Sequence, residues 1–183
     1  MYTDSDWAGD KNTRKSTSGG VAVVGGGTIK SWASTQSTRA LSSGEAEYYA
    51  LIKAAAEGLG MQSIARDLGF DLVIRIWVDS SAAKAIVSRI GLGKVRHMEV
   101  KYLWAQEAHK AGRFIVSKIA GAKNPAEVVT KPLSANDMGP KLRMVSGYIE
   151  SRKTLASWNT EGKEQRKSWA DIEDDIVSET DFI

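Results

Sequence analysis

The sequence contains no cysteine and only two histidines among its 183 residues. Without cysteine the chain can form neither disulfides nor thiolate zinc sites. His97 and His109 alone are too few for an imidazole-based zinc site. A metal site in this protein would therefore be built from carboxylates, which favours hard cations.

Long apolar runs are also missing. None approaches the roughly 20 residues that a membrane-spanning helix requires, and the N-terminus lacks the charged and apolar regions of a signal peptide. We therefore expect no membrane association and a cytoplasmic or nuclear location. Hydrophobic residues make up 42% of the chain, which is enough for the core of one domain of ordinary size.

Charge is divided unevenly along the chain. Residues 1–133 carry 18 Lys and Arg against 12 Asp and Glu, whereas residues 134–183 carry 7 against 10. The basic part suits a polyanionic partner, although a solvated surface could carry the same excess without any ligand. We predict a domain over residues 1–133 and a polar to acidic C-terminal tail over residues 134–183, partly helical or disordered.

Hydrophobic periodicity predicts an α/β protein. The pattern predicts strands over residues 1–4, 21–24, 28–33, 72–78 and 114–119, and helices over residues 43–68, 80–90, 98–111 and 124–129. The nearly continuous apolarity of residues 72–78 is typical of a central strand covered on both faces. Too few apolar residues precede Asp4 for a buried strand. We therefore expect the first strand to be truncated and the chain to be a fragment of a longer protein.

Four acids stand at the edges of these elements, namely Asp4, Glu45, Asp79 and Glu127. Ligands of open α/β sheets bind at the carboxyl ends of the strands. Two hard cations held between carboxylates can stabilise both the attacking and the leaving oxygen in phosphodiester hydrolysis. The spacing of the acids is thus compatible with a two-metal nuclease.

Each acid also has a simpler interpretation. Ser42 and Glu45 fit a capping box, in which both side chains bind amides at the start of a helix. Asp4 and Asp6 fit a solvated turn, and Glu127 fits an acid favoured by the dipole in the first turn of a helix. On spacing alone, these alternatives stay open.

Five motifs follow one another along residues 2–133. They are Tyr2-x-Asp4-x-Asp6-Trp7-Ala8-Gly9-Asp10, Arg14-Lys15-Ser16-Thr17-Ser18-Gly19, Ala40-Leu41-Ser42-Ser43-x-Glu45-Ala46-Glu47-Tyr48, Asp79-Ser80-x-Ala82 and Thr130-Lys131-Pro132-Leu133. In this order they closely resemble the ribonuclease H domain of copia-type LTR retrotransposon polyproteins. The resemblance implies a ribonuclease H-like fold, a five-stranded mixed sheet with flanking helices. It also implies metal-dependent cleavage of the RNA strand of RNA–DNA hybrids, without a covalent enzyme intermediate.

The resemblance further implies which residues bind metal. The expected ligands and catalytic residues of a two-metal site are Asp4, Glu45, Asp79 and Glu127, with Mg²⁺ as the cofactor and Mn²⁺ as the alternative. Asp6 and Glu47 lie beside the matching positions and are expected to play supporting or structural roles. Glu127 stands where the family usually has aspartate, so its carboxylate should lie further out.

The resemblance also implies which basic residues contact nucleic acid and which partners the protein has. Arg14, Lys15, Lys94 and Arg96 are expected to contact phosphates, largely without regard to base sequence. His97 matches a histidine common in the family, with surface packing as the alternative. The implied partners are an RNA–DNA hybrid and an upstream reverse transcriptase domain of the same polyprotein, in the cytoplasm, in virus-like particles or in the nucleus. The alternative function is a non-catalytic hybrid-binding or structural remnant of a decayed retroelement polyprotein.

Overall fold

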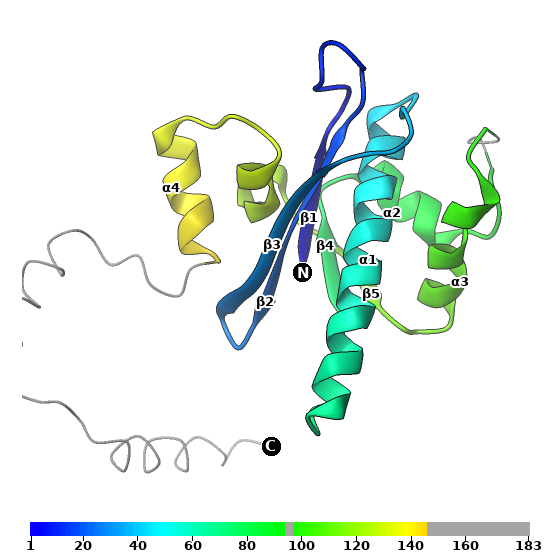
Figure 1. Ribbon diagram of the computed structural model, residues 1–183, viewed down its shortest axis with the longest axis vertical. Helices are drawn as coiled ribbons and strands as arrows, with labels where there is room; N and C mark the ends of the chain where they lie inside the picture. The colour runs from blue at the N-terminus through cyan, green and yellow to red at the C-terminus, as the bar shows by residue number, and fades with distance from the viewer. Residues whose placement is uncertain (94–96, 146–183) are drawn as a thin grey trace, which may run out of the picture. The chain divides into compact units, whose positions relative to one another are not determined.

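A five-stranded mixed sheet forms the centre of the computed structural model, which describes residues 1–93 and 97–145 (Figure 1). The strands are β1 (Tyr2–Asp6), β2 (Thr17–Val24), β3 (Gly27–Thr35), β4 (Arg75–Val78) and β5 (Ile115–Lys118). Their order is β3-β2-β1-β4-β5. β2 pairs antiparallel with β1 and β3, whereas β4 pairs in parallel with β1 and β5. The predicted α/β class and five-stranded mixed sheet are confirmed.

Helices connect the strands and flank the sheet. They are α1 (Ser43–Asp67), α2 (Ser81–Ser88), α3 (Trp104–Lys110) and α4 (Ala135–Arg143), with the short 3-10 helices η1 (Val100–Tyr102), η2 (Gly121–Lys123) and η3 (Pro125–Val129). The single helix predicted over residues 98–111 is thus divided into η1 and α3. Among the described residues, no helix has both the length and the apolarity needed to cross a membrane.

Successive glycines of β2 show how the two faces of the sheet are covered. A Cβ atom on Gly19 would lie 2.4 Å from the side chain of Thr130, which follows η3. A Cβ atom on Gly20 would lie 2.1 Å from the ring of Trp32, which packs against the core that contains α1. Because neighbouring residues of a strand point to opposite faces, α1 covers one face and η3 the other. Only glycine leaves room for such close approach at both positions.

α1 is the helix that the sequence predicted most accurately. Ser42 caps its start, since the Ser42 hydroxyl accepts a hydrogen bond from the amide of Glu45 at 3.2 Å. Residues 44–52 are all buried, as expected for a run that is apolar on nearly every face. After the helix ends, Gly69 adopts a φ of 86°, a conformation that glycine adopts without strain. The buried first half of α1 therefore holds the acids of its first turns against the sheet.

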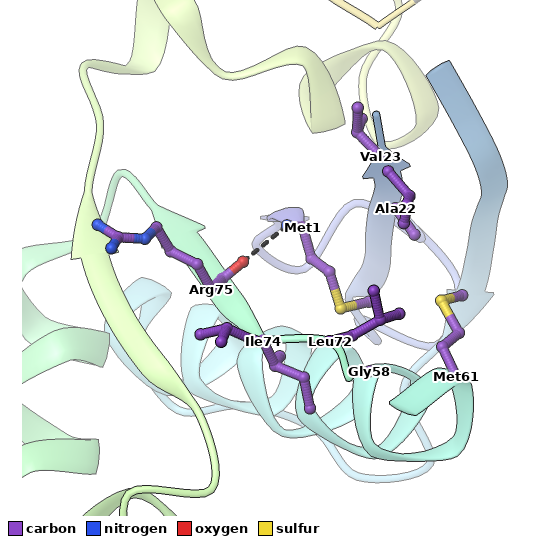
Figure 2. Close-up of a pocket in the computed structure, with 10 residues that line it drawn as sticks. Met1, Ala22, Val23, Gly58, Met61, Leu72, Ile74 and Arg75 are labelled. Carbon is purple, nitrogen blue, oxygen red and sulfur yellow. Dashed lines mark hydrogen bonds between the residues drawn. The ribbon is translucent and has the colours of Figure 1, made fainter. Parts of the chain in front are cut away.

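The start of β1 lies next to an apolar cavity. Tyr2 pairs with Val21, so β2 extends three residues past β1. Met1 continues the ladder, because its amino group donates to the carbonyl of Arg75 at 2.7 Å and its carbonyl accepts from the amide of Trp77 at 2.8 Å. Beyond it lies a cavity of about 210 Å³ (Figure 2), whose lining includes Met1, Ala22, Val23, Met61, Leu72 and Ile74. Truncation of the first strand stays a prediction.

α4 lies within the region predicted as a tail. Lys141 of this helix is buried, and its contacts with the sheet domain are described below. The acidic end from Asp171 onward lies outside the described residues. Internal contacts group residues 1–147 into one compact unit. The boundary after residue 133 and the character of the tail remain predictions, which a truncation series can test.

Candidate active site

Three of the predicted acids meet at one edge of the sheet. β1 and β4 are parallel, so Asp4 near the end of β1 and Asp79 directly after β4 reach the same edge. Glu127 joins them from η3. One carboxylate oxygen of each acid lies within 4.8 Å of the other two. We call Asp4, Asp79 and Glu127 the acid cluster.

Asp4 is the buried member of the acid cluster, with no exposed surface. The hydroxyl of Thr130 donates a hydrogen bond to Oδ2 of Asp4, and the Nζ atom of Lys131 lies 3.2 Å from Oδ1. Burial raises the pKa of Asp4, and it stays raised although Thr130 and Lys131 act in the opposite direction. The site therefore disfavours the negative charge of this carboxylate even with the ammonium of Lys131 beside it.

Glu127 is positioned by the N-terminal cap of η3. The side chain of Asn124 accepts a hydrogen bond from the amide of Ala126 at 3.2 Å and donates one to the carbonyl of Thr3 at 2.9 Å. These bonds tie the start of η3 to β1, next to Asp4. The cap fits the predicted opening of a short helix by asparagine and proline, although the helix formed is of the 3-10 type.

Two lysines hold the carboxylate of Glu127. Lys131 Nζ lies 3.2 Å from Oε1, and Lys141 Nζ lies 2.6 Å from Oε2. Burial alone would raise the pKa of Glu127, but hydrogen bonds from both lysines hold it below its ordinary value. The two lysines therefore favour the charged form of Glu127.

Lys141 is itself fixed by backbone carbonyls. Its ammonium donates to the carbonyls of Gly121 at 2.9 Å, Ala122 at 3.2 Å and Asn124 at 3.4 Å. α4 thus anchors both Glu127 and the segment from η2 to Asn124 that precedes it. The sequence did not predict this role, because an isolated lysine in a polar segment looks like a solvated residue.

Glu45 does not join the acid cluster. Its carboxylate accepts hydrogen bonds from the amide of Leu41 at 3.0 Å and the hydroxyl of Tyr49 at 2.7 Å, and lies 2.8 Å from Nε2 of His97. The carboxylate is 1% exposed, so these partners surround it. Together with the cap by Ser42, the contacts match the helix-capping alternative for Glu45. They also give His97 a partner that the sequence did not predict.

Glu47 is the acid of α1 that lies near Asp4 and Asp79. Its Oε1 accepts a hydrogen bond from the amide of Ser5 at 3.2 Å. Its Oε2 is buried and has no hydrogen-bond partner among the described residues. Burial, followed by the charges of Asp4 and Asp79, raises the pKa of Glu47 to about 8. A buried carboxylate oxygen without a donor is well suited to binding a cation.

Helix geometry explains why only one of the two glutamates can face the cluster. On an α-helix, the side chains of two residues that are two positions apart are about 200° apart around the helix axis, so they point to nearly opposite sides. Glu45 therefore points toward Leu41 and His97 when Glu47 points toward Asp4. The spacing of Ser42 and Glu45 was the sequence signal for a capping role of Glu45, although the Glu45 carboxylate binds the amide of Leu41 and not that of Ser42.

The predicted phosphate-binding residues divide into two groups. Arg14 and Lys15 lie in the loop between β1 and β2, at the edge of the sheet that carries the acid cluster and the start of α1 (Figure 1). The amide of Arg14 donates to the carbonyl of Asp10 at 2.8 Å, and Arg39 donates to the carbonyl of Thr13 in the same loop at 2.7 Å. Arg39 therefore adds a basic residue to this edge. Lys94 and Arg96 lie outside the described residues.

Comparisons with known proteins identify relatives of this sequence. No protein-family model matches the chain. A crystal structure of LC11-RNase H1 in complex with an RNA/DNA hybrid is similar with a TM-score of 0.45 and 21% identity, covering 70% of this chain and 91% of that one. The chain is 31% identical over 137 residues to the retrovirus-related Pol polyprotein from transposon TNT 1-94 of Nicotiana tabacum, and 29% identical over 137 residues to that from transposon RE1 of Arabidopsis thaliana.

These alignments cover 74% and 73% of this chain but only 10% and 9% of the two polyproteins. The chain thus spans about a tenth of the length of these relatives. Its homologues are retrovirus-related Pol polyproteins from plant transposons.

Proposed function

We propose that this protein is a metal-dependent endoribonuclease of the ribonuclease H type, which cleaves the RNA strand of RNA–DNA hybrids. The observation that carries the proposal is the acid cluster of Asp4, Asp79 and Glu127 at the carboxyl edge of β1 and β4, with Glu47 beside it. The similarity to Pol polyproteins of plant transposons agrees with the motifs, which point to a copia-type element.

We assign metal binding to Asp4, Glu47, Asp79 and Glu127. Glu47 replaces Glu45 of the sequence-based ligand set, because Glu45 is engaged by Leu41, Tyr49 and His97. All donors are carboxylate oxygens, the ligands that Mg²⁺ prefers, and Mn²⁺ is the alternative. Two bound cations would supply the Lewis acidity for in-line hydrolysis of a phosphodiester.

The chain's own residues prepare this site in two ways. Glu47 must lose a proton before it can bind a cation, so metal binding should strengthen as the pH rises toward its pKa of about 8. Thr130 and Asn124 hold Asp4 and η3 in place, which keeps the carboxylates close together when their charges repel one another. The geometry of the site thus depends on neutral hydrogen-bonding residues as well as on lysines.

We assign recognition of the hybrid to the basic loop that contains Arg14 and Lys15, with Lys94 and Arg96 as further proposed contacts. Contacts of this kind bind phosphates and carry little base specificity. The proposed protein partner is a reverse transcriptase domain that lies upstream in the same polyprotein. Cytoplasm, virus-like particles or nucleus are the proposed sites of action.

The proposal is tested with a hybrid whose RNA strand is labelled at one end. The purified chain should cut the RNA strand with Mg²⁺ or Mn²⁺ and not with EDTA, and should leave single-stranded RNA and duplex DNA intact. Asp79→Asn is the control variant, because it keeps the shape of the side chain and removes a ligand charge. Binding of the hybrid without cleavage under all metal conditions would instead identify a non-catalytic remnant.

A further inference from the structure

Lys131 makes contacts that the proposed function does not explain. Its Nζ atom lies 3.2 Å from Oδ1 of Asp4 and 3.2 Å from Oε1 of Glu127. A single ammonium therefore bridges two of the three carboxylates in the acid cluster. The amide of Lys131 also donates to the carbonyl of Glu127 at 3.0 Å, so the backbone at this position is fixed relative to η3.

The ammonium of Lys131 reduces the repulsion between the carboxylates, as a bound metal cation would. Carboxylates that lie within 4.8 Å of one another repel strongly in a buried site. A positive charge between Asp4 and Glu127 offsets that repulsion. A Mg²⁺ ion on the same oxygens would have to lie about 2.0–2.1 Å from them. It would then compete with the ammonium both for space and for negative charge.

The two lysines of the site differ in how firmly they are held. Lys141 is 6% exposed, and its ammonium also binds three backbone carbonyls. Lys131 is 37% exposed, and among the described residues its ammonium contacts the carboxylates of Asp4 and Glu127. Its flexible four-carbon stem allows the ammonium to move into solvent. Lys131 is therefore the lysine that a bound metal can displace, whereas Lys141 stays in place.

We propose that Lys131 is a built-in counter-cation of the acid cluster, which neutralises Asp4 and Glu127 in the metal-free protein and is displaced when divalent cations bind. This inference rests on the proposed function, since it takes the acid cluster to be a cation site. Lys131 then has two opposite effects. It stabilises the metal-free fold, and it raises the metal concentration at which the site fills.

Thermal unfolding of the full chain at increasing Mg²⁺ or Mn²⁺ concentrations tests the proposal without measuring activity. Lys131→Met should lower the melting temperature in EDTA and should lower the half-saturating metal concentration by at least about threefold. Lys118→Met is the matched control. Lys118 lies at the same edge, paired with Val78, but its ammonium binds the hydroxyl of Ser81. Its loss should change half-saturation by less than about twofold.

Equal half-saturation in the parent and Lys131→Met, or equal shifts in both variants, would overturn the inference while leaving the metal site intact. Absence of any stabilisation of the parent by either ion would overturn the proposed function and the inference with it. If Lys131→Met does not fold, an NMR measurement on the parent protein still tests the displacement of Lys131. The side-chain ¹⁵N signal of Lys131, assigned by its loss in Lys131→Arg, should shift on addition of Mg²⁺, and an unchanged signal would count against displacement.

Discussion

The ammonium of Lys141 lies 2.6 Å from Oε2 of Glu127, which makes α4 a support of the acid cluster. The same ammonium binds two carbonyls of η2 and that of Asn124, which precedes η3. One residue from the region predicted as a tail therefore helps to hold Glu127 in place. This relationship leads to the first two predictions.

Lys141→Met should destabilise the protein by about 2–3 kcal/mol, because it leaves buried carbonyls and one oxygen of Glu127 without their charged donor. Urea-induced unfolding measures the loss. Arg143→Met is the control, since Arg143 is an exposed cation of the same helix. Equal losses in the two variants would mean that Lys141 has no special structural role.

Truncation at two positions locates the end of the domain. A chain that ends at Leu133 lacks Lys141 and should unfold at a lower temperature, whereas a chain that ends at Gly147 keeps α4 and should match the full-length protein. Differential scanning calorimetry in EDTA compares the three chains. If the shorter chain melts with the other two, the boundary after residue 133 is correct and α4 is dispensable.

Glu47→Gln and Glu45→Gln should have different effects on cleavage. Glu47→Gln removes a proposed ligand and should reduce cleavage of the hybrid by at least about 100-fold. Glu45→Gln can still accept the amide of Leu41, so cleavage should persist. Initial rates at saturating Mg²⁺ decide between them, and circular dichroism checks that both variants fold. Loss of cleavage in Glu45→Gln alone would restore Glu45 to the ligand set.

The raised pKa of Glu47 predicts how stability depends on pH. The ordinary pKa is 4.5 and the folded value is about 8, so the folded protein binds more protons than the unfolded chain between these values. In EDTA the protein should therefore lose stability as the pH rises from 4.5 to 8, by at most about 1.4 kcal/mol per pH unit from this group. Urea unfolding of the parent and Glu47→Gln isolates the effect, because the variant lacks this group. Parallel pH profiles would contradict the assignment.

An apolar extension before Met1 should stabilise the fold. Two added residues such as Val-Leu would continue β1 between Val23 and Ile74 and fill part of the apolar cavity, contributing about 1–2 kcal/mol. They would also move the terminal amino group, whose pKa partial burial lowers to about 6, away from its position beside the carbonyl of Arg75. A Ser-Gly extension is the control. Equal melting temperatures for both extensions would show that the cavity does not accept a strand.

The sequence predicted the sheet and α1 because these elements depend on patterns that extend over many residues. The sequence also predicted that Asp4 and Asp79 lie close together, since each stands near the end of a strand and parallel strands place these ends at one edge of the sheet. Glu45 and Glu47 were harder to distinguish. Both lie in the same motif, and their roles depend on how α1 is rotated about its axis. The sequence pattern does not define this rotation, because the first turns of α1 are buried on every side.

Lys131 and Lys141 show a second limit of sequence-based prediction. A lysine has the same polarity whether it is solvated or enclosed, and burial of Lys141 depends on carbonyls and a carboxylate that converge only in the folded chain. α4 is short and contains Pro140, so its pattern does not indicate that it packs on the domain. Charged residues that balance a cluster of acids are visible only in three dimensions.

The bonds from Thr130 and Lys131 to Asp4 span 126 and 127 residues, which affects the order in which the site can form during synthesis. A ribosome delivers Asp4 well before Lys131, whose ammonium balances its charge. Contacts of such long sequence separation are slow to form, and incomplete domains expose surfaces that promote aggregation. The acid cluster is thus among the last parts of the domain to assemble, and a chain released before residue 127 would carry Asp4 without its counter-charge.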